Sequence, residues 1–363
     1  MRTVFATRRQ FLVAAGAGLL APGCLGGGGG PETASRAQPS APPRLVGPIH
    51  AAVPAGSVDT ADAADFTSTR GARVSLIVHS GGPDLIRLVA AGGVDTVLAR
   101  QDDIAALAAQ GLLAPLDHSL VPNLADVSPA LLDLPYDPGN RFSAPARHGA
   151  FGFAYRPDAV TGEPASWGDF FAILPRYSRR GIVLLPGRTE PIAAALAAGG
   201  ADINSDDPAD LDAARTLLLQ VLPHVNAFST NPAAAFVPEA LVLAMGAASA
   251  FARQAPTATF VLPDGGAESW IDAWAVTAAT PRPETAHAFV SHQLSPAAQA
   301  RDWVFSKTPA AVPAAARLVP ARLRTNPLTR LGAGLGSGFT PSLLSPVGLA
   351  QRTQIWAEIG PRG

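Results

Sequence analysis

The chain has 363 residues, of which 48% are hydrophobic and 15% charged, and its formal net charge is −1. This length suits two domains, and the hydrophobic content excludes a largely disordered chain. No stretch concentrates the basic residues that phosphate binding requires, so the composition also argues against a nucleic-acid-binding protein.

The first 24 residues read as an export signal. Arg8 and Arg9 precede an apolar run over residues 11–21, which is about half of the ~20 residues that a membrane-spanning helix needs. A basic segment followed by a short apolar run is typical of a secretory signal, and the arginine pair favours the twin-arginine (Tat) route. The alternative is a Sec signal whose basic region holds two arginines by coincidence.

Cys24 is the only cysteine of the chain and ends the sequence LAPGC at residues 20–24. This pentapeptide resembles a bacterial lipobox, with alanine where leucine is more usual. We therefore expect Cys24 to be lipidated and to anchor the protein at the outer face of a membrane; the alternative is a free thiol in a cleaved segment. Residues 25–45 are rich in Gly, Pro and Ser and predict a flexible tether.

From residue 46 onward the pattern becomes that of an α/β domain. We expect strands at residues 45–52, 73–79 and 94–99, and helices at 60–70, 82–91 and 103–110. Strands that alternate with helices predict a mostly parallel sheet, in which ligands bind beyond the carboxyl ends of the strands.

Four polar residues follow the strand at 94–99 and are therefore candidates for ligand binding. They are Arg100, Gln101, Asp102 and Asp103. The alternative for the two aspartates is capping of the helix that begins there, a common role of acidic residues in a first turn.

The second half of the chain repeats this α/β pattern. Residues 142–155 alternate small and aromatic side chains and predict an extended crossing segment. We then expect a helix after Ser166, a strand at 181–185, a helix ending near residue 198, and a helix from Asp206 or Asp207 to residue 220. Glu190 lies just past the strand at 181–185 and is another candidate for ligand binding.

Residues 260–299 predict a strand, a glycine turn, a second strand and a helix. Trp270 and Asp272 lie two residues apart on the second strand, so their side chains should share one face. An indole face and a carboxylate on the same side suit a cationic ligand. The alternative is a core tryptophan beside a capping or turn aspartate.

Several segments, taken in order, resemble the spermidine/putrescine-binding family of bacterial extracellular solute-binding proteins. They include YDPGNRFSAPARHGAFGFAYRPDAV at 136–160, SWGDFF at 166–171, GGAESWIDAWAV at 265–276 and HAFVSHQLSPAAQARDWVFSKTPAAVPAA at 287–315. The resemblance extends over about residues 46–320.

The resemblance implies a two-lobed α/β fold, the type II periplasmic-binding-protein fold, with each lobe a mostly parallel sheet flanked by helices. Hinge crossings would join lobe 1, residues 46–150 and 273–318, to lobe 2, residues 151–272 and 319–363. It also implies a monomer that captures a polyamine and delivers it to an ABC permease, with no metal or cofactor. Membrane contact would come from the lipid anchor alone.

Trp270, Asp272 and Glu190 fall on family residues that bind the ligand, whereas other positions depart from the family. Arg100 and Asp102 stand where the family has Ser and Tyr. Two family aromatic positions also differ: Pro54-Ala55 stand where the family has a Trp-Thr pair, and Met245 stands where it has a tryptophan.

These departures leave the ligand open. The same scaffold could take another solute, such as a small anion or an amino acid, through Arg100 and Arg188, because arginine binds carboxylates and phosphates bidentately. A non-transporting sensor or structural lipoprotein is a further alternative. The sequence holds no G-x-S-x-G or H-E-x-x-H motif, and we expect no catalysis.

Overall fold

The computed structural model describes residues 45–177, 182–185, 189–229, 233, 242–255, 258–263, 266–326, 339–341 and 344–360. The chain divides into residues 1–43 and a compact unit at residues 44–363. The predicted export signal, Cys24, most of the tether and Arg188 lie outside the described residues. Within the described residues, no helix is long and apolar enough to cross a membrane.

The first elements alternate strand and helix, as the sequence predicts. They are β1 (Ile49–Pro54), α1 (Thr60–Arg70), β2 (Val74–His79), α2 (Gly82–Ala90), β3 (Thr96–Arg100) and α3 (Gln101–Ala109). β1 pairs in parallel with β2 on one side and with β3 on the other. Because β1 is inside the sheet and its faces are covered, its residues Ala51, Ala52 and Val53 are buried.

Two long strands continue the sheet into the second half of the chain. β4 (Ser143–Tyr155) and β9 (Ala267–Val276) pair antiparallel, and every residue of both is buried. β9 also pairs antiparallel with β3, and β4 with β7 (Leu243–Ala247). The main path through the sheet is β2-β1-β3-β9-β4-β7-β5-β6, so parallel strands lie at both ends and antiparallel pairs in the middle.

The remaining strands are short. β5 (Ile182–Leu184) pairs in parallel with β7 and with β6 (Ala227–Phe228). β8 (Thr259–Val261) pairs with β4, and β10 (Phe339–Pro341) pairs with β9.

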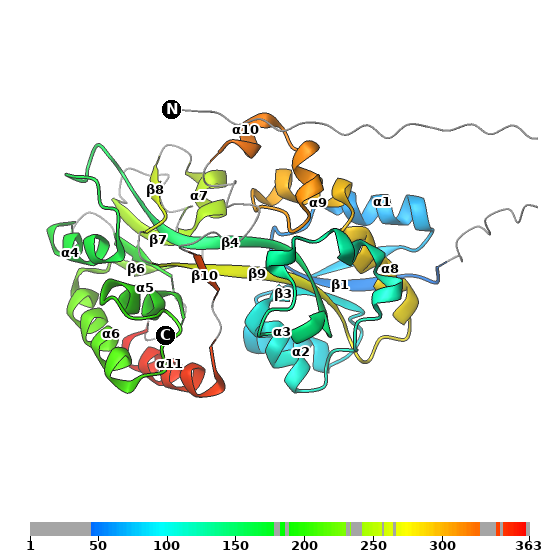
Figure 1. Ribbon diagram of the computed structural model, residues 1–363, viewed down its shortest axis with the longest axis horizontal. Coiled ribbons are helices and arrows are strands. Elements are labelled where there is room, and N and C mark those ends of the chain that lie inside the picture. Colours follow the sequence, from blue (N-terminus) through cyan, green and yellow to red (C-terminus); the bar gives the residue numbers. More distant parts are fainter. Residues whose placement is uncertain are drawn as a thin grey trace, which may run out of the picture. The chain divides into compact units, whose positions relative to one another are not determined.

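The other α-helices are α4 (Trp167–Tyr177), α5 (Glu190–Ala198), α6 (Pro208–Val221), α7 (Ala248–Gln254), α8 (Pro283–Gln293), α9 (Pro296–Ser306), α10 (Ala321–Arg324) and α11 (Pro346–Ile359). Short 3₁₀ helices occupy His118–Leu120, Pro122–Asp126, Pro129–Leu131, Pro138–Asn140, Leu222–His224 and Pro313–Arg317. In Figure 1, α1, α2, α3 and α8 gather around one end of the β4–β9 pair, and α4, α5, α6 and α11 around the other.

Two large hydrophobic cores lie with these two groups of helices, and the buried residues of α2 and α3 form a further cluster with β1, β3 and β9. We call the part built on β1–β3, α1–α3 and α8 lobe 1, and the part built on α4–α6, β5–β7 and α11 lobe 2. In lobe 1, Trp274 packs edge-on against Phe289 of α8, with ring centroids 5.4 Å apart. In lobe 2, Phe153 packs against Phe170 of α4, with ring centroids 5.1 Å apart. β4 and β9 contribute to both cores, and the architecture is therefore the two-lobed α/β fold that the sequence predicts.

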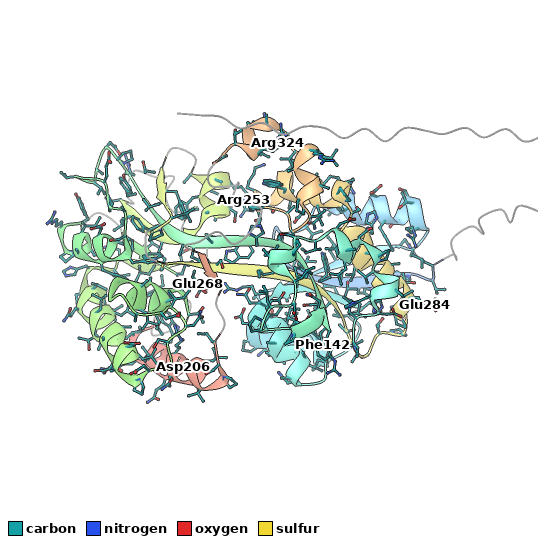
Figure 2. The ribbon with its side chains drawn as sticks, viewed as in Figure 1. Phe142, Asp206, Arg253, Glu268, Glu284 and Arg324 are labelled. Atoms are coloured by element: carbon teal, nitrogen blue, oxygen red, sulfur yellow. The ribbon has the colours of Figure 1, made fainter. Side chains whose placement is uncertain are left out.

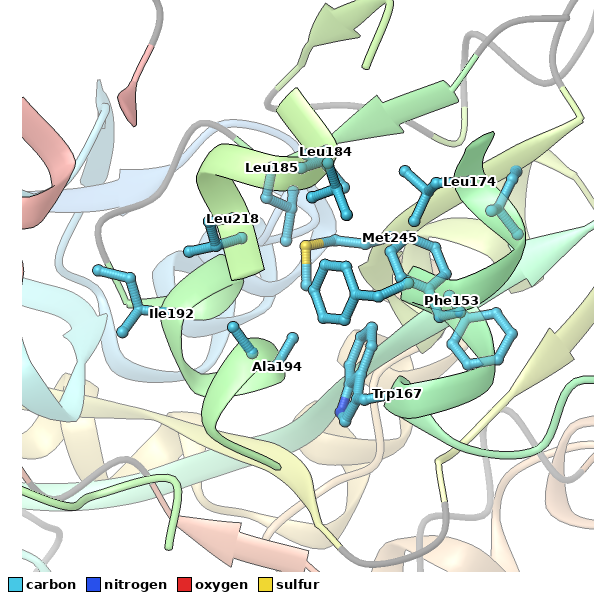
Figure 3. Close-up of a cluster of buried hydrophobic side chains, with 14 of the residues drawn as sticks. Phe153, Trp167, Leu174, Leu184, Leu185, Ile192, Ala194, Leu218 and Met245 are labelled. Atoms are coloured by element: carbon cyan, nitrogen blue, oxygen red, sulfur yellow. The ribbon is translucent and has the colours of Figure 1, made fainter. Parts of the chain in front are cut away.

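Met245, which stands at a family tryptophan position, belongs to the lobe 2 core (Figure 3). Its side chain is fully buried among apolar residues that include Phe153 and Leu184. Met245 therefore packs the lobe 2 core and is shielded from solvent.

Candidate ligand site

The strand register places three charged residues, Arg100, Asp272 and Arg147, side by side on adjacent strands of the sheet that both lobes share. β9 lies between β3 and β4, and Asp272 is paired in register with both Arg100 and Arg147. Arg100 is the last residue of β3, and Glu190 is the first residue of α5 in lobe 2. The predicted candidates therefore come from separate parts of the chain and meet around the middle of the sheet.

Arg100 is surrounded by carboxylates. Its Nη1 donates to Glu190 Oε1 at 3.1 Å, and its Nε donates to Asp102 Oδ1 at 3.3 Å. Its Nη2 lies 3.6 Å from Oε1 of Glu268, which lies near the end of β9 that pairs with β10 (Figure 2). The guanidinium also lies 5.4 Å from the centroid of the Phe151 ring, within cation–π range.

Burial and charge shift the ionisation of this cluster. Burial, with the neighbouring Glu190 carboxylate, raises the pKa of Glu268 from 4.5 to about 8, although Arg100 opposes the shift. Burial lowers the pKa of Arg100, but the surrounding carboxylates outweigh this and raise it above its ordinary value, so Arg100 stays a cation. Both carboxylate oxygens of Glu268 are without a hydrogen-bond partner among the described residues, and its side chain is 4% exposed.

Trp270 lies against the backbone of the neighbouring strand. A Cβ atom at Gly149, its partner on β4, would come within 2.4 Å of the indole ring, so only glycine leaves room for it. The ring is 6.5 Å from that of Phe151, and Trp270 belongs to the lobe 2 core. Its Nε1 is buried with no hydrogen-bond partner in the described part of the chain. Trp270 is thus a packed core residue that keeps one unused donor.

Asp272 forms a buried ion pair inside the sheet. Arg147 donates to Asp272 Oδ2 from Nε at 2.8 Å and lies 2.7 Å from it through Nη2. Arg147 Nη1 donates to the backbone carbonyl of Ser57 at 2.6 Å and to Asp302 Oδ1 at 3.4 Å. Burial raises the pKa of Asp302 to about 7, against the effect of Arg147.

Asp272 is therefore neither a turn nor a capping residue, the alternative that the sequence left open. Its position in the interior of β9 puts it opposite a buried arginine that already matches its charge. Both contacts of Arg147 with this side chain are to Oδ2.

Sequence reasoning missed Glu268, Arg147 and Phe151. The signal for Glu268 is its position two residues before Trp270, because side chains at alternate positions of a strand share a face. Arg147 and Phe151 lie in the segment identified as an extended crossing, but only the register of β4 on β9 shows what they face.

The two aspartates after β3 have different partners. Asp103 accepts a hydrogen bond from the backbone N–H of Gly82 at 2.9 Å, at the start of α2 rather than of its own helix. Asp102 pairs with Arg100, and its side chain is 43% exposed. Arg188 lies outside the described residues, so its predicted role stays a prediction. No group of histidine, cysteine and acidic side chains among the described residues could hold a metal ion.

Comparison with known proteins identifies relatives over most of the chain. The family model described as bacterial extracellular solute-binding protein matches residues 61–323. The chain is 32% identical over 208 residues to the spermidine/putrescine-binding periplasmic protein 1 of Haemophilus influenzae, a match that covers 56% of this chain and 57% of that protein, less than two thirds of its length.

Two further matches extend over more of the chain. The putrescine/agmatine-binding protein of Pseudomonas aeruginosa is 26% identical over 293 residues, covering 75% of this chain and 80% of that one. The structure of the spermidine/putrescine ABC transporter substrate-binding protein of Streptococcus pneumoniae superposes with a TM-score of 0.76 at 18% identity, covering 86% of this chain and 98% of that one. At this identity, the structural match establishes the fold.

Proposed function

The chain belongs to the bacterial extracellular solute-binding proteins, the family that includes spermidine/putrescine-binding proteins of ABC transporters, and we propose that it captures a small organic cation of the polyamine class between its two lobes. The family supports a small-molecule ligand and an ABC permease as partners. It gives no support to catalysis, since the relatives found are solute-binding proteins.

The observation that carries this proposal is the excess of carboxylates around Arg100. Asp102, Glu190 and Glu268 all lie within 4 Å of the one guanidinium. Carboxylates form charge-assisted hydrogen bonds with ammonium groups, and each cation–π contact with an aromatic face adds about 0.5–2 kcal/mol. The ring of Phe151 lies beside these carboxylates and offers such a face.

The same charges argue against a small anion as solute. Arg100 has three acidic side chains within 4 Å, and Arg147, the buried arginine of the site, is paired with Asp272 and Asp302. An anion entering here would meet more negative than positive charge, and an arginine with its donors already engaged offers few hydrogen bonds.

Export and anchoring complete the proposal. The signal at residues 1–24 would direct the protein across the membrane by the Tat route, lipidation of Cys24 would hold it at the outer face, and residues 25–45 would tether the binding unit near the permease. We further propose the lobe boundaries stated from the sequence, with chain crossings within β4 and β9, the two strands that contribute to both cores, and a third crossing near residues 317–322.

A thermal-shift panel on residues 25–363, without the signal and the lipidated cysteine, tests the proposed ligand class. The panel holds putrescine, spermidine, spermine, basic and neutral amino acids, and small anions. Ligand binding raises Tm by an amount that grows with ligand concentration over Kd, and we expect a concentration-dependent rise with polyamines. A rise with anions alone would contradict the proposal.

A further inference from the structure

We propose that Arg100 is an internal cation that competes with the solute for Glu190 and Glu268, and that this competition determines which cations the protein binds. The inference rests on the proposed function, because it concerns the binding of a cationic solute at the same cluster.

The surroundings of the Arg100 guanidinium are those that a bound ammonium group would need. Glu190 accepts a hydrogen bond at 3.1 Å, Glu268 lies at 3.6 Å, and the Phe151 ring centroid lies at 5.4 Å. Arg100 extends from β3 of lobe 1, whereas Glu190 begins α5 of lobe 2. Arg100 therefore occupies, from one lobe, the position that a solute cation would take between both.

Arg100 leaves Glu268 incompletely satisfied. The 3.6 Å separation is too long for a hydrogen bond, and both oxygens of this buried carboxylate lack a partner among the described residues. A buried acceptor without a partner costs about 1–3 kcal/mol. An ammonium group has three N–H donors on one nitrogen and could reach Glu190 and Glu268 together. A solute ammonium is thus a better partner for Glu268 than Arg100 is.

Arg100 also has a partner to retain when a solute displaces it. Asp102 lies in the first turn of α3, accepts from Arg100 Nε at 3.3 Å and is 43% exposed. A guanidinium that leaves Glu190 can stay paired with Asp102 and turn toward water. Asp102 therefore acts on the solute through Arg100, as a positioning residue that receives the displaced side chain.

Selectivity follows from this competition. A monoamine must displace a guanidinium that is held by several acceptors, and its single ammonium group makes only one charge–charge contact in the cluster. A solute with two or more ammonium groups gains a second charge–charge contact in the cluster and displaces Arg100 more readily. The structure therefore predicts discrimination against monoamines that depends on Arg100.

Calorimetric titration of the mature protein with putrescine, spermidine and butylamine tests the inference. Arg100→Ala should bind putrescine about tenfold more tightly than the wild type, because one charge-assisted hydrogen bond is no longer contested. It should also bind butylamine measurably. Arg156→Ala is the matched control: its side chain is 27% exposed against 25% for Arg100, and it pairs with Asp158 away from the site. We expect Arg156→Ala to leave both affinities unchanged.

Two more variants keep the test decisive. Arg100→Lys retains the charge but not the planar guanidinium, and it should increase the putrescine affinity by less than Arg100→Ala does. This variant replaces Arg100→Ala in the test if the alanine variant does not fold. In a Glu190→Gln background, Arg100→Ala should give a smaller gain, because the contested charge of Glu190 is gone and only Glu268 remains contested. Unchanged or weaker polyamine binding in Arg100→Ala and Arg100→Lys, with a wild type that does bind polyamines, overturns the inference alone. No polyamine binding by the wild type or any variant overturns the proposed function and the inference with it.

Discussion

The carboxylate of Asp272 has a partner inside the protein, and this changes what its substitution should do. From the sequence, a ligand-facing aspartate could be replaced at little cost to stability. In the structure, Arg147 and Asp272 are both buried and hydrogen-bonded, so removing one charge leaves the other poorly matched.

Asp272→Asn should therefore lower the free energy of unfolding by about 2–4 kcal/mol. This is somewhat less than the usual cost of breaking a buried ion pair, because Arg147 keeps Asp302 as a second partner. Denaturant unfolding followed by circular dichroism measures this change. Asp158→Asn, in an exposed pair with Arg156, is the control and should cost less than about 1 kcal/mol. Equal stabilities for the two variants would show that the buried pair contributes nothing.

The raised pKa of Glu268 predicts that cation binding depends on pH. Its pKa in the folded protein is about 8, raised from 4.5 by burial and by Glu190 and lowered in part by Arg100. Asp102 and Arg352 are the other charged groups that act on it. A bound cation favours the ionised form, so binding at neutral pH should release a proton, and affinity should rise between about pH 6.5 and pH 9.

Titrations in two buffers with different ionisation enthalpies measure the released protons. Glu268→Gln should release fewer protons than the wild type and show a flatter affinity profile. Folding stability should change in the opposite sense. The folded protein keeps a proton that the unfolded chain loses above about pH 4.5, so this group's contribution to stability falls as the pH rises toward 8. Proton uptake on binding would contradict this assignment of Glu268.

At the scale of elements, sequence patterns located most helices and strands to within a few residues. Their start signals are local: Asp59, Asp207 and Ser295 each accept a hydrogen bond from a backbone N–H in the first turn of the helix that follows. The alternation along β9 was enough to place Trp270 and Asp272 on one face.

The neighbours of β9 in the sheet are set by pairing between segments that are far apart in the sequence, and these neighbours could not be predicted from local patterns. The partner of Asp272 is set by the register of β4, and the carboxylates around Arg100 come from α3, α5 and β9. No periodicity in one segment encodes such contacts. The ligand-facing role of the site residues therefore stays a prediction, whereas the family and the fold are confirmed.

The sequence left two aspartates as candidates for the start of α6, and the structure gives them different roles. Asp207 caps α6 by accepting from Ala209 N at 2.7 Å, whereas Asp206 accepts from Ser345 Oγ at the start of α11 at 2.6 Å. Asp207→Ala should cost about 1 kcal/mol of stability through loss of the cap. In hydrogen exchange, it should expose the first turn of α6.

Asp206→Ala should instead increase exchange at the start of α11 and leave α6 protected. Asp212→Ala, on the exposed side of α6, is the control for both variants. The same exchange pattern for Asp206→Ala and Asp207→Ala would contradict this division of roles.

At the scale of the whole binding unit, β4 and β9 are the strands on which both lobes are built. Their apolar residues divide between the lobe cores: Ile271 and Trp274 go to lobe 1, and Phe151 and Trp270 go to lobe 2. Asp272 lies between Ile271 and Trp274 on β9, and its partner Arg147 lies opposite it on β4. The buried pair of Arg147 with Asp272 and the cluster around Arg100 lie on or beside these shared strands. Motion of one lobe relative to the other would therefore change their contacts directly.

The central claim is that the carboxylates around Arg100 bind a cationic solute, and titration of the mature protein with spermidine and putrescine tests it most directly. The account predicts saturable binding whose affinity decreases as the ionic strength increases. In Glu190→Gln, which removes the charge of this acceptor and keeps its shape, the affinity should be lower by at least about tenfold. Polyamine binding with undiminished affinity in Glu190→Gln, or binding of anions in place of polyamines, would contradict it.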